Sequence, residues 1–406
     1  MRGSAGLCRA IGVVACLWGG FAVAQVPPVL KIGVLTDFAG STADSAGQGS
    51  VVAARLAAED GLRDAAGALR GVRIEVLSGS NLAKPDVALT IARQWLDQEG
   101  VAAIADLPYS NVALAMSALG AERDRAVLIG SAATSDLTGR ACNAVTTQWT
   151  DDSYMLATGT ARTLAKAGRK TWFFVTADYA FGQAMQRDAT AAIEAEGGTV
   201  LGAVRHPLPS PDMSSFMTQA IASRAQVIGL ANVGADTTNA VREAASFGLR
   251  QGGQQLAGFL VFINDVHSLG LAAAQGLLVT SGYYWDANDA SRAFAERFRS
   301  QMGRPPAKPH AAVYASVRHW LRAVDDTASV SGAVTTRAMN MTSAEYFGQT
   351  ATVRADGRVL YDLQLYQVKT PAESRGPWDY YKPVATLPRD DTIRPLAEGG
   401  CKMVGG

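Results

Sequence analysis

The sequence predicts a mixed α/β protein built from two doubly wound parallel-sheet lobes. Short apolar segments typical of buried strands alternate with alanine-rich amphipathic segments typical of helices, which is the pattern of a doubly wound sheet. The pattern runs in two successive series, and a chain of 406 residues exceeds what a single hydrophobic core usually supports. We therefore expect two lobes.

The first series begins with a strand, a polar loop and a helix inside thirty residues. The segment 32–35 predicts a buried strand and the segment 51–60 a helix. The loop between them, 37–49, is rich in Gly, Ser, Thr and Asp, which cap helices and offer hydrogen-bond donors. Ligands of open α/β sheets bind outside the carboxyl ends of the strands, so this loop is a candidate ligand contact. Further strands are predicted at 73–77, 101–105 and 127–129, with helices at 87–96 and 114–122.

The second series predicts strands at 172–175, 200–204, 227–230, 256–262 and 277–280, with helices at 182–195, 213–222 and 237–247. Two more helices are predicted at 290–302 and 311–324. Asp356-Gly357 then lies between two apolar segments, which predicts the tight turn of an antiparallel hairpin. The tail after Lys369 has no clear period, and we expect it to wrap the surface.

The N-terminus has the pattern of a secretory signal. Arg2 and Arg9 precede an apolar run that ends in small residues, which predicts cleavage near Ala24 and an exported protein. A lipid anchor at Cys16 is disfavoured because the apolar run continues past it. No later segment reaches the roughly 18 to 20 consecutive apolar residues of a membrane span.

Composition excludes nucleic acid as a partner, since 37 basic residues balance 36 acidic ones and leave no excess positive charge. Removal of the signal leaves two cysteines, Cys142 and Cys401, which in an oxidising compartment suggest a disulfide. Two unrelated buried thiols are the alternative. The bridge is favoured because Cys401 lies in a Gly-rich tail with little apolar content to bury it.

Catalytic and metal-binding motifs are absent from the sequence. It contains no GxSxG nucleophile elbow, no HExxH, no P-loop and no GxGxxG after a strand, and its four histidines lack ligand spacing. Asp106, Asp178 and Asp265 stand at strand ends and could act as general bases, but no nucleophile or metal pattern accompanies them. We therefore expect no enzyme activity, no metal and no cofactor.

Four segments together resemble a known family. They are KIGVLTDFAG at 31–40, LIGSAATSDLTG at 128–139, FFVTADYAFGQA at 173–184 and GLLVTSGYYW at 276–285. In this order behind an export signal, they resemble the type I periplasmic binding proteins of the leucine/isoleucine/valine-binding type. The resemblance implies two lobes joined by three crossover strands, and ligand capture in the cleft by hinge closure. It also implies a periplasmic monomer that serves the membrane permease of an ABC importer.

The same resemblance implies a division of the chain. The crossovers would fall near 146–149, 280–283 and 346–350. The expected parts are the signal at 1–24, lobe one at 25–145 plus 282–341, lobe two at 146–281 plus 342–370 and a tail at 371–406 that packs on the lobes.

Carried over residue by residue, the family's carboxylate site falls on Ser110 with Asn111 and on Ala133 with Thr134. Helix N-terminal N–H groups and hydroxyls stabilise an anion without a formal positive charge, although Ser110 and Thr134 could equally be simple helix caps. In lobe two, Phe181 stands where amino-acid receptors have a tyrosine. Its ring could cover a ligand without donating a hydrogen bond, and Tyr179 could supply a hydroxyl.

No glutamate stands where amino-acid receptors place an acid against the ligand ammonium. Asp236 or Asp265 could substitute, or the ligand could be a plain organic or aromatic carboxylate. The full set of predicted ligand contacts is Phe38, Ser41, Tyr109, Ser110, Asn111, Ala133, Thr134, Tyr179, Phe181, Asn232, Asp236 and Asp265.

The sequence thus favours an extracytoplasmic receptor of an ABC importer, with a branched-chain or other amino acid, or an aromatic or organic acid, as its ligand. Two other classes compete with it. A ligand-sensing receptor domain of a signalling system uses the same fold, but the export signal and the missing anchor argue against it. An exported enzyme is disfavoured by the absence of a reaction constellation.

Overall fold

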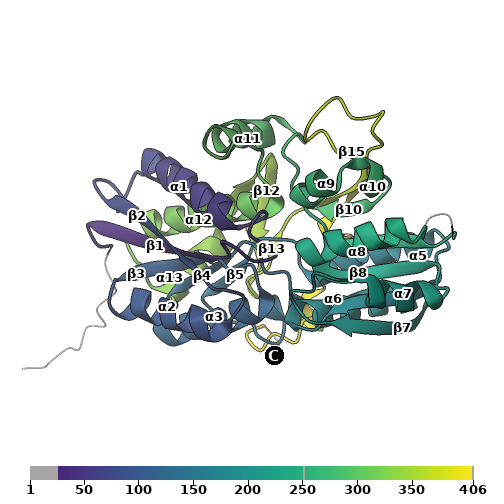
Figure 1. Ribbon diagram of the computed structural model, residues 1–406. Helices are drawn as coiled ribbons and strands as arrows, with labels where there is room; N and C mark the ends of the chain where they lie inside the picture. The colour runs from purple at the N-terminus through teal and green to yellow at the C-terminus, as the bar shows by residue number, and fades with distance from the viewer. Residues whose placement is uncertain (1–25, 250–251, 405–406) are drawn as a thin grey trace, which may run out of the picture.

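Two α/β lobes lie side by side in the structure, a computed structural model that describes residues 26–249 and 252–404 (Figure 1). The predicted signal segment and its cleavage point lie outside the described residues. Each lobe is built around a parallel sheet, as the two series of alternating strands and helices predicted.

The first lobe contains a five-stranded parallel sheet in the order β2-β1-β3-β4-β5. Helices α1, α12 and α13 pack against one face of this sheet, with α11 packed on α1, and α2 and α3 cover the other face. The elements are β1 Val29–Thr36, α1 Gly47–Asp64, β2 Arg73–Ser80, α2 Pro85–Asp97, β3 Val101–Asp106, α3 Ser110–Arg123, β4 Ala126–Ile129, β5 Thr146–Gln148, α11 Asp289–Met302, α12 Lys308–Thr327 and α13 Gly332–Met341, with a 3-10 turn, η1, at Ser135–Thr138.

The second lobe contains a four-stranded parallel sheet in the order β7-β6-β8-β9, with a separate antiparallel sheet β10-β14-β15 beside it. Two apolar clusters fill this lobe, one under α6 and η2 and the other under α7 and α8. The elements are α4 Ser153–Leu156, η2 Ala157–Arg162, α5 Thr163–Lys166, β6 Thr171–Ala177, α6 Ala180–Ala195, β7 Thr199–His206, α7 Ser214–Ala222, β8 Val227–Val233, α8 Ala235–Ser246, β9 Gln255–Leu260, α9 Ile263–Leu269, α10 Leu271–Ala274, β10 Leu278–Ser281, β14 Leu363–Val368 and β15 Tyr381–Leu387.

The hairpin at Asp356-Gly357 forms as predicted, but its packing differs from the expectation. Strands β11 Ser343–Tyr346, β12 Gln349–Val353 and β13 Val359–Leu360 make a small antiparallel sheet. Its apolar side chains join the buried cluster of α1 and α12 in the first lobe, whereas the expected place was lobe two. Residues 346–349 are the turn between β11 and β12, so the third connection between the lobes runs instead from β13 into β14. The remaining boundaries of the expected division stay a proposal.

The tail contains a strand that the sequence did not predict. β15 pairs with β14 at the edge of the antiparallel sheet, and the register shifts near Pro383. Four of its seven residues are exposed, two are partly buried and one is buried, and no alternation of apolar residues marks the strand. Main-chain pairing rather than side-chain pattern therefore defines this strand. Beyond it lie only the short turns α14 Arg389–Thr392 and η3 Leu396–Glu398.

The buried carboxylate of Asp151 links all three connections between the lobes. It follows the first connection, and its oxygens accept hydrogen bonds from the Gly282 N–H at 3.2 Å and from the Tyr361 hydroxyl at 3.0 Å. Gly282 belongs to the second connection and Tyr361 to the third. The Lys308 ammonium at the start of α12 completes the group, 2.8 Å from Asp151 Oδ2. We call Asp151, Gly282, Tyr361 and Lys308 the hinge cluster.

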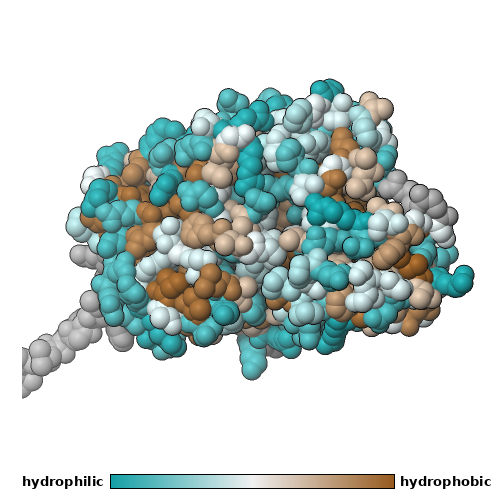
Figure 2. All heavy atoms as spheres, in the orientation of Figure 1, coloured by the Kyte–Doolittle hydropathy of each residue, from teal (hydrophilic) through white to brown (hydrophobic). Residues whose placement is uncertain are grey.

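A disulfide between Cys142 and Cys401 fastens the tail to the first lobe, with the two Cα atoms 5.6 Å apart. Polar residues cover most of the face in Figure 2, and apolar patches lie over the region of α2 and α3. Of the helices that the structure describes, none combines the length and the apolar content needed to cross a bilayer.

Candidate functional site

The two lobes touch where the carboxyl ends of their parallel strands face each other. The Ala235 N–H at the start of α8 in the second lobe lies 3.4 Å from the Ser41 carbonyl oxygen in the loop after β1. Nearby, the rings of Tyr109 and Tyr179, one from each lobe, meet edge to face with centroids 6.5 Å apart. The loops that the sequence marked as candidate ligand contacts therefore come together, and the structure shows the lobes in a closed arrangement.

Gly234 permits this close approach. A Cβ at this position would lie 1.9 Å from the Ser41 carbonyl oxygen, and the backbone has a φ of +60°. Side chains other than hydrogen are therefore excluded both by contact and by conformation.

A second contact between the lobes lies beside the first connection. The Ser135 hydroxyl donates to Asp188 Oδ2 at 2.7 Å, and Arg187 reaches back to Ser135 Oγ at 2.9 Å and to Asp136 at 3.4 Å. Arg187 and Asp188 belong to α6 in the second lobe, whereas Ser135 and Asp136 belong to η1 in the first. These partly buried ion pairs and hydrogen bonds hold the same closed arrangement.

Asp37 organises the loop after β1. Its carboxylate accepts from the Tyr109 hydroxyl at 2.7 Å, the Gly40 N–H at 2.7 Å and the Thr42 hydroxyl at 2.9 Å. Burial opposes ionisation of Asp37, but these hydrogen bonds outweigh it and lower its pKa. Burial also raises the pKa of Tyr109 to about 12, so its hydroxyl stays a donor. Tyr109 thus supports the loop that holds Ser41.

The four residues predicted for the carboxylate site lie close together in the first lobe. Ser110 Oγ accepts from the Thr134 N–H at 3.2 Å, and Thr134 Oγ1 accepts from the Asp136 N–H at 3.3 Å. Both hydroxyl groups therefore keep their own proton for another acceptor. Asn111 Oδ1 is buried without a partner among the described residues, and the Ala133 carbonyl accepts from the Ser153 N–H.

In the second lobe, Tyr179 rather than Phe181 faces the first lobe. Phe181 is 1% exposed and packs among Trp172, Phe174 and Met185, so in this structure its ring is a core contact and not the predicted cover over a ligand. Tyr179 is half-buried and contacts apolar clusters of both lobes. Burial raises the pKa of its hydroxyl, and the negative charge of Asp236 adds to this effect.

Asp236 is a buried acid that lacks a full set of partners. Its Oδ1 accepts from the Ser210 N–H at 3.0 Å, whereas Oδ2 has no hydrogen bond among the described residues. His206 Nδ1 lies 3.7 Å from Oδ2 but bonds to the Pro207 carbonyl at 2.8 Å, and burial lowers the pKa of this histidine. A neutral His206 leaves the carboxylate unpaired, so burial raises the pKa of Asp236 to about 6.

We predict that Asp236→Asn stabilises the protein at neutral pH. The unfolded carboxyl ionises near pH 3.9 and the folded one near 6, so the folded state binds more protons in this window and its stability falls as the pH rises. The variant lacks this loss. Its free energy of unfolding should therefore exceed that of the parent by about 3 kcal/mol at pH 7 and should not exceed it at pH 3.5. Urea unfolding of both proteins at the two pH values measures the difference. If the variant and the parent differ in free energy of unfolding by the same amount at both pH values, the assignment of Asp236 as a buried, ionised carboxylate would be wrong.

Three further predicted contacts have different surroundings: Asn232 lies inside the second lobe, Phe38 in the loop after β1 and Asp265 at the start of α9. Asn232 is fully buried, and its side chain bonds to Thr237 and to His206 inside the second lobe. Phe38 is 40% exposed in the loop after β1. The Asp265 carboxylate accepts from the Phe262 N–H and caps α9; its pKa is raised to about 7 by burial, with Lys308 opposing the shift. Asp265 therefore supports a helix start near the hinge cluster.

Several residues of this site were missed by the sequence analysis. Asp37, Arg187 and Asp188 were not singled out, because their partners are distant in sequence and no motif marks them. Asp106 was noticed only as an acid at a strand end. In the structure it is buried, with a φ of +82° that is uncommon outside glycine, and such strain is often found at functional sites.

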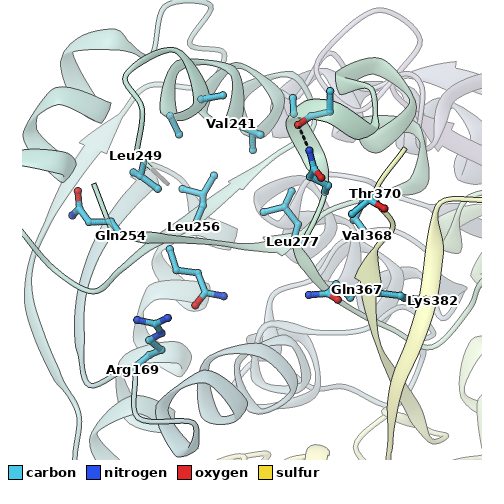
Figure 3. Close-up of a pocket in the computed structure, with 18 residues that line it drawn as sticks. Arg169, Val241, Leu249, Gln254, Leu256, Leu277, Gln367, Val368, Thr370 and Lys382 are labelled. Atoms are coloured by element: carbon cyan, nitrogen blue, oxygen red, sulfur yellow. Dashed lines mark hydrogen bonds between the residues drawn. The ribbon is translucent and has the colours of Figure 1, made fainter. Parts of the chain in front are cut away.

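A separate cavity of about 770 Å³ opens in the second lobe, away from the contact between the lobes (Figure 3). Its floor is apolar, with Val241, Leu256 and Leu277, and Arg169 and Lys382 lie at its polar margin. No group of three or more His, Cys, Asp or Glu side chains within 26–249 and 252–404 is arranged to hold a metal ion.

The fold and the site together define a two-lobed α/β binding protein whose lobes meet at the carboxyl ends of their parallel strands. The sequence matches the Periplasmic binding protein family over residues 29–376, and the chain belongs to this family. The predicted resemblance and fold class are thereby confirmed.

Three relatives illustrate the similarity. A periplasmic binding protein from Burkholderia mallei, known from a crystal structure, is 39% identical in sequence to this chain. The two structures match with a TM-score of 0.89, and the match covers 93% of this chain and 99% of that one. A branched chain amino acid ABC transporter periplasmic ligand-binding protein from Burkholderia xenovorans is 34% identical, with a TM-score of 0.81 and coverage of 92% and 99%. Leu/Ile/Val-binding protein homolog 6 of Brucella melitensis is 28% identical over 228 residues, which span 55% of this chain and 57% of that protein.

Proposed function

We propose that this protein is the extracytoplasmic receptor of an ABC importer, and that it captures a small carboxylate-bearing ligand between its lobes by hinge closure. The observation that carries the proposal is the meeting of loops from both lobes at Ser41 and Ala235, beside side chains with free hydrogen-bonding capacity. Family membership and the likeness to an amino-acid transporter component support it. We further propose that the protein acts as a periplasmic monomer that delivers its ligand to a membrane permease.

The chemistry of the unpartnered groups favours an amino acid over a plain acid. Thr134 and Ser110 keep hydroxyl protons that can be donated to a ligand carboxylate, and the α3 N-terminus lies beside them. Asp236 Oδ2 and Asn111 Oδ1 are acceptors without partners, which suit an ammonium group. Asp236 would thus pair with the ligand ammonium, the role for which the sequence offers no glutamate.

A thermal-shift screen with leucine, other amino acids, benzoate and 4-hydroxybenzoate tests the proposal. A ligand that binds only the folded state raises the unfolding midpoint with concentration. We expect amino acids to give the larger shifts. Small-angle scattering with a saturating amount of the best ligand should show a smaller radius of gyration than that of the free protein, and an unchanged radius despite confirmed binding would contradict hinge closure. A hit that the protein converts chemically would favour an enzyme, and no hit in either class would contradict the proposal.

Thr134→Ala is expected to weaken binding of the ligand found by this screen. Hydrogen bonds to charged groups contribute about 1.5 to 3 kcal/mol, so the affinity should fall roughly ten- to a hundredfold. Thr134→Ser serves as the matched control, because both variants lose the threonine methyl group but only Thr134→Ala also loses the hydroxyl that caps η1. Calorimetry measures the three affinities. Equal affinities in the parent and in a folded Thr134→Ala variant would place the carboxylate site elsewhere.

A further inference from the structure

A short segment of the second lobe reaches across to the apolar core of the first lobe. Residues 207–213 connect β7 to α7 and carry Leu208, whose side chain packs against the apolar cluster under α2 and α3. Every buried member of that cluster belongs to the first lobe, among them Leu107, Tyr109 and Val112. The Leu208 contact therefore joins the two lobes. We call residues 207–213 the strap.

Leu208 is turned inwards between two exposed prolines. Pro207 and Pro209 are exposed, whereas Leu208 is partly buried. Its side chain packs on the cluster of the first lobe and on neither of the two apolar clusters that fill the second lobe. The apolar surface of Leu208 is therefore covered by the opposite lobe, and this cover depends on how close the lobes stand.

The strap is fastened to its own lobe just after Leu208. The Ser210 N–H donates to Asp236 Oδ1 at 3.0 Å, and the Pro211 carbonyl accepts from Asn239 Nδ2 at 3.2 Å. Met213, at the end of the strap, is fully buried in the apolar cluster under α7 and α8. These attachments hold the strap as part of the second lobe, so Leu208 moves with that lobe when the hinge opens.

The strap lies at the edge of the second lobe that is remote from two of the three connections. β7 is one edge strand of the sheet β7-β6-β8-β9, and β9 at the other edge contacts β10. The second connection follows β10, and the third enters β14, which pairs with β10. Figure 1 shows β7 and α7 on the opposite side of this lobe from β10. A contact far from a hinge separates on a small rotation, so opening must break the Leu208 contact.

From these observations we infer that the strap is an apolar latch, in which Leu208 docks on the first lobe as the lobes close and keeps part of the ligand-free population closed. The inference rests on the hinge movement of the proposed function but not on the identity of the ligand. A ligand that prefers the closed arrangement then binds more tightly, because a larger fraction of the protein already has that arrangement.

Pulsed electron paramagnetic resonance on the ligand-free, full mature protein tests the latch. Spin labels are placed at Arg93→Cys on α2 and Gln219→Cys on α7, two exposed helix positions in different lobes. The native cysteines are bonded to each other and do not take a label. We expect a short and a long distance between the labels, for closed and open protein.

Leu208→Ala removes most of the apolar contact and should lower the ratio of short to long distances about threefold or more. Leu208→Asp would place a carboxylate against the apolar cluster and should lower this ratio at least tenfold. Leu201→Asp is the matched control, because Leu201 is an exposed leucine of β7 outside the strap, and the ratio should not change. Urea unfolding checks that each variant is folded.

Three results would overturn the latch. They are a parent protein without the short distance, a folded Leu208→Asp variant with the ratio of the parent, and an equal fall of the ratio in Leu201→Asp, which would reflect added charge alone. Failure of every candidate ligand in the thermal-shift screen would contradict the proposed function instead, because these distances are measured without a ligand.

Discussion

Asp151→Asn is expected to lower the free energy of unfolding by about 3 to 5 kcal/mol, the usual effect of breaking a buried ion pair. Asp151 and Lys308 have side-chain exposures of 2% and 5%, and the Lys308 ammonium lies 2.8 Å from the carboxylate. The amide that replaces the carboxylate can still accept from Gly282 and Tyr361. The loss therefore reports the uncompensated buried charge on Lys308 rather than a missing acceptor. Because folded proteins are stable by only about 5 to 15 kcal/mol, the effect is large.

A double-mutant cycle provides the control. Lys308→Met alone leaves the Asp151 charge unpaired and should also destabilise, whereas the double variant removes both charges and should recover most of the stability. Urea unfolding at pH 7 measures all four proteins. Losses that simply add in the double variant would show that the two charges do not interact across the hinge cluster.

Loss of the Cys142–Cys401 bridge is expected to lower the free energy of unfolding by about 2 to 5 kcal/mol. The two cysteines are 259 residues apart, so the bridge closes a very long loop in the unfolded chain and restricts it strongly. The tail is also held by other contacts, such as Arg394 Nη2 to the Ser135 carbonyl at 2.8 Å, which keep it near the first lobe in the reduced protein. The folded structure should therefore survive reduction with lower stability.

Mass spectrometry of non-reduced peptides establishes whether the bridge is present in exported protein. Urea unfolding with and without dithiothreitol then gives its contribution, and a Cys142→Ala/Cys401→Ala variant, which should not respond to the reductant, is the control. Two free thiols in the exported protein, or a parent whose unfolding does not respond to the reductant, would contradict the prediction.

Elements with a strong apolar pattern were predicted well from the sequence. The strand at 32–35 lies in β1 and the helix at 182–195 in α6, because a buried strand and an amphipathic helix each need a regular spacing of apolar residues. β15 escaped prediction because its exposed residues need no such spacing, and α13 because its buried face consists mostly of Gly332, Thr335 and Thr336 rather than of apolar side chains. The hairpin at Asp356-Gly357 was recognised from its turn, but a local turn signal does not say which core the strands will join.

The candidate site was likewise predicted only in part from the sequence. Ser110 and Thr134 could be carried over from the family pattern, and the structure brings them within hydrogen-bonding distance. The sequence could not show that Phe181 packs inwards while Tyr179 faces the other lobe, since both stand at the start of one helix and differ in direction only when the helix is placed.

The sequence by itself determined the α/β class, the two series of strands and helices, and membership of the binding-protein family, because these depend on periodic burial and on ordered local segments. The tertiary structure alone decided which distant side chains meet. Asp151 gathers three connections, the first and third of which lie 210 residues apart, Asp37 accepts from the Tyr109 hydroxyl, and Ser41 contacts Ala235 across the lobes. The contacts of Asp151 and Ser41 depend on how the two lobes are placed relative to each other, and that of Asp37 depends on how β1 and α3 are placed within the first lobe. No spacing along the chain encodes either placement.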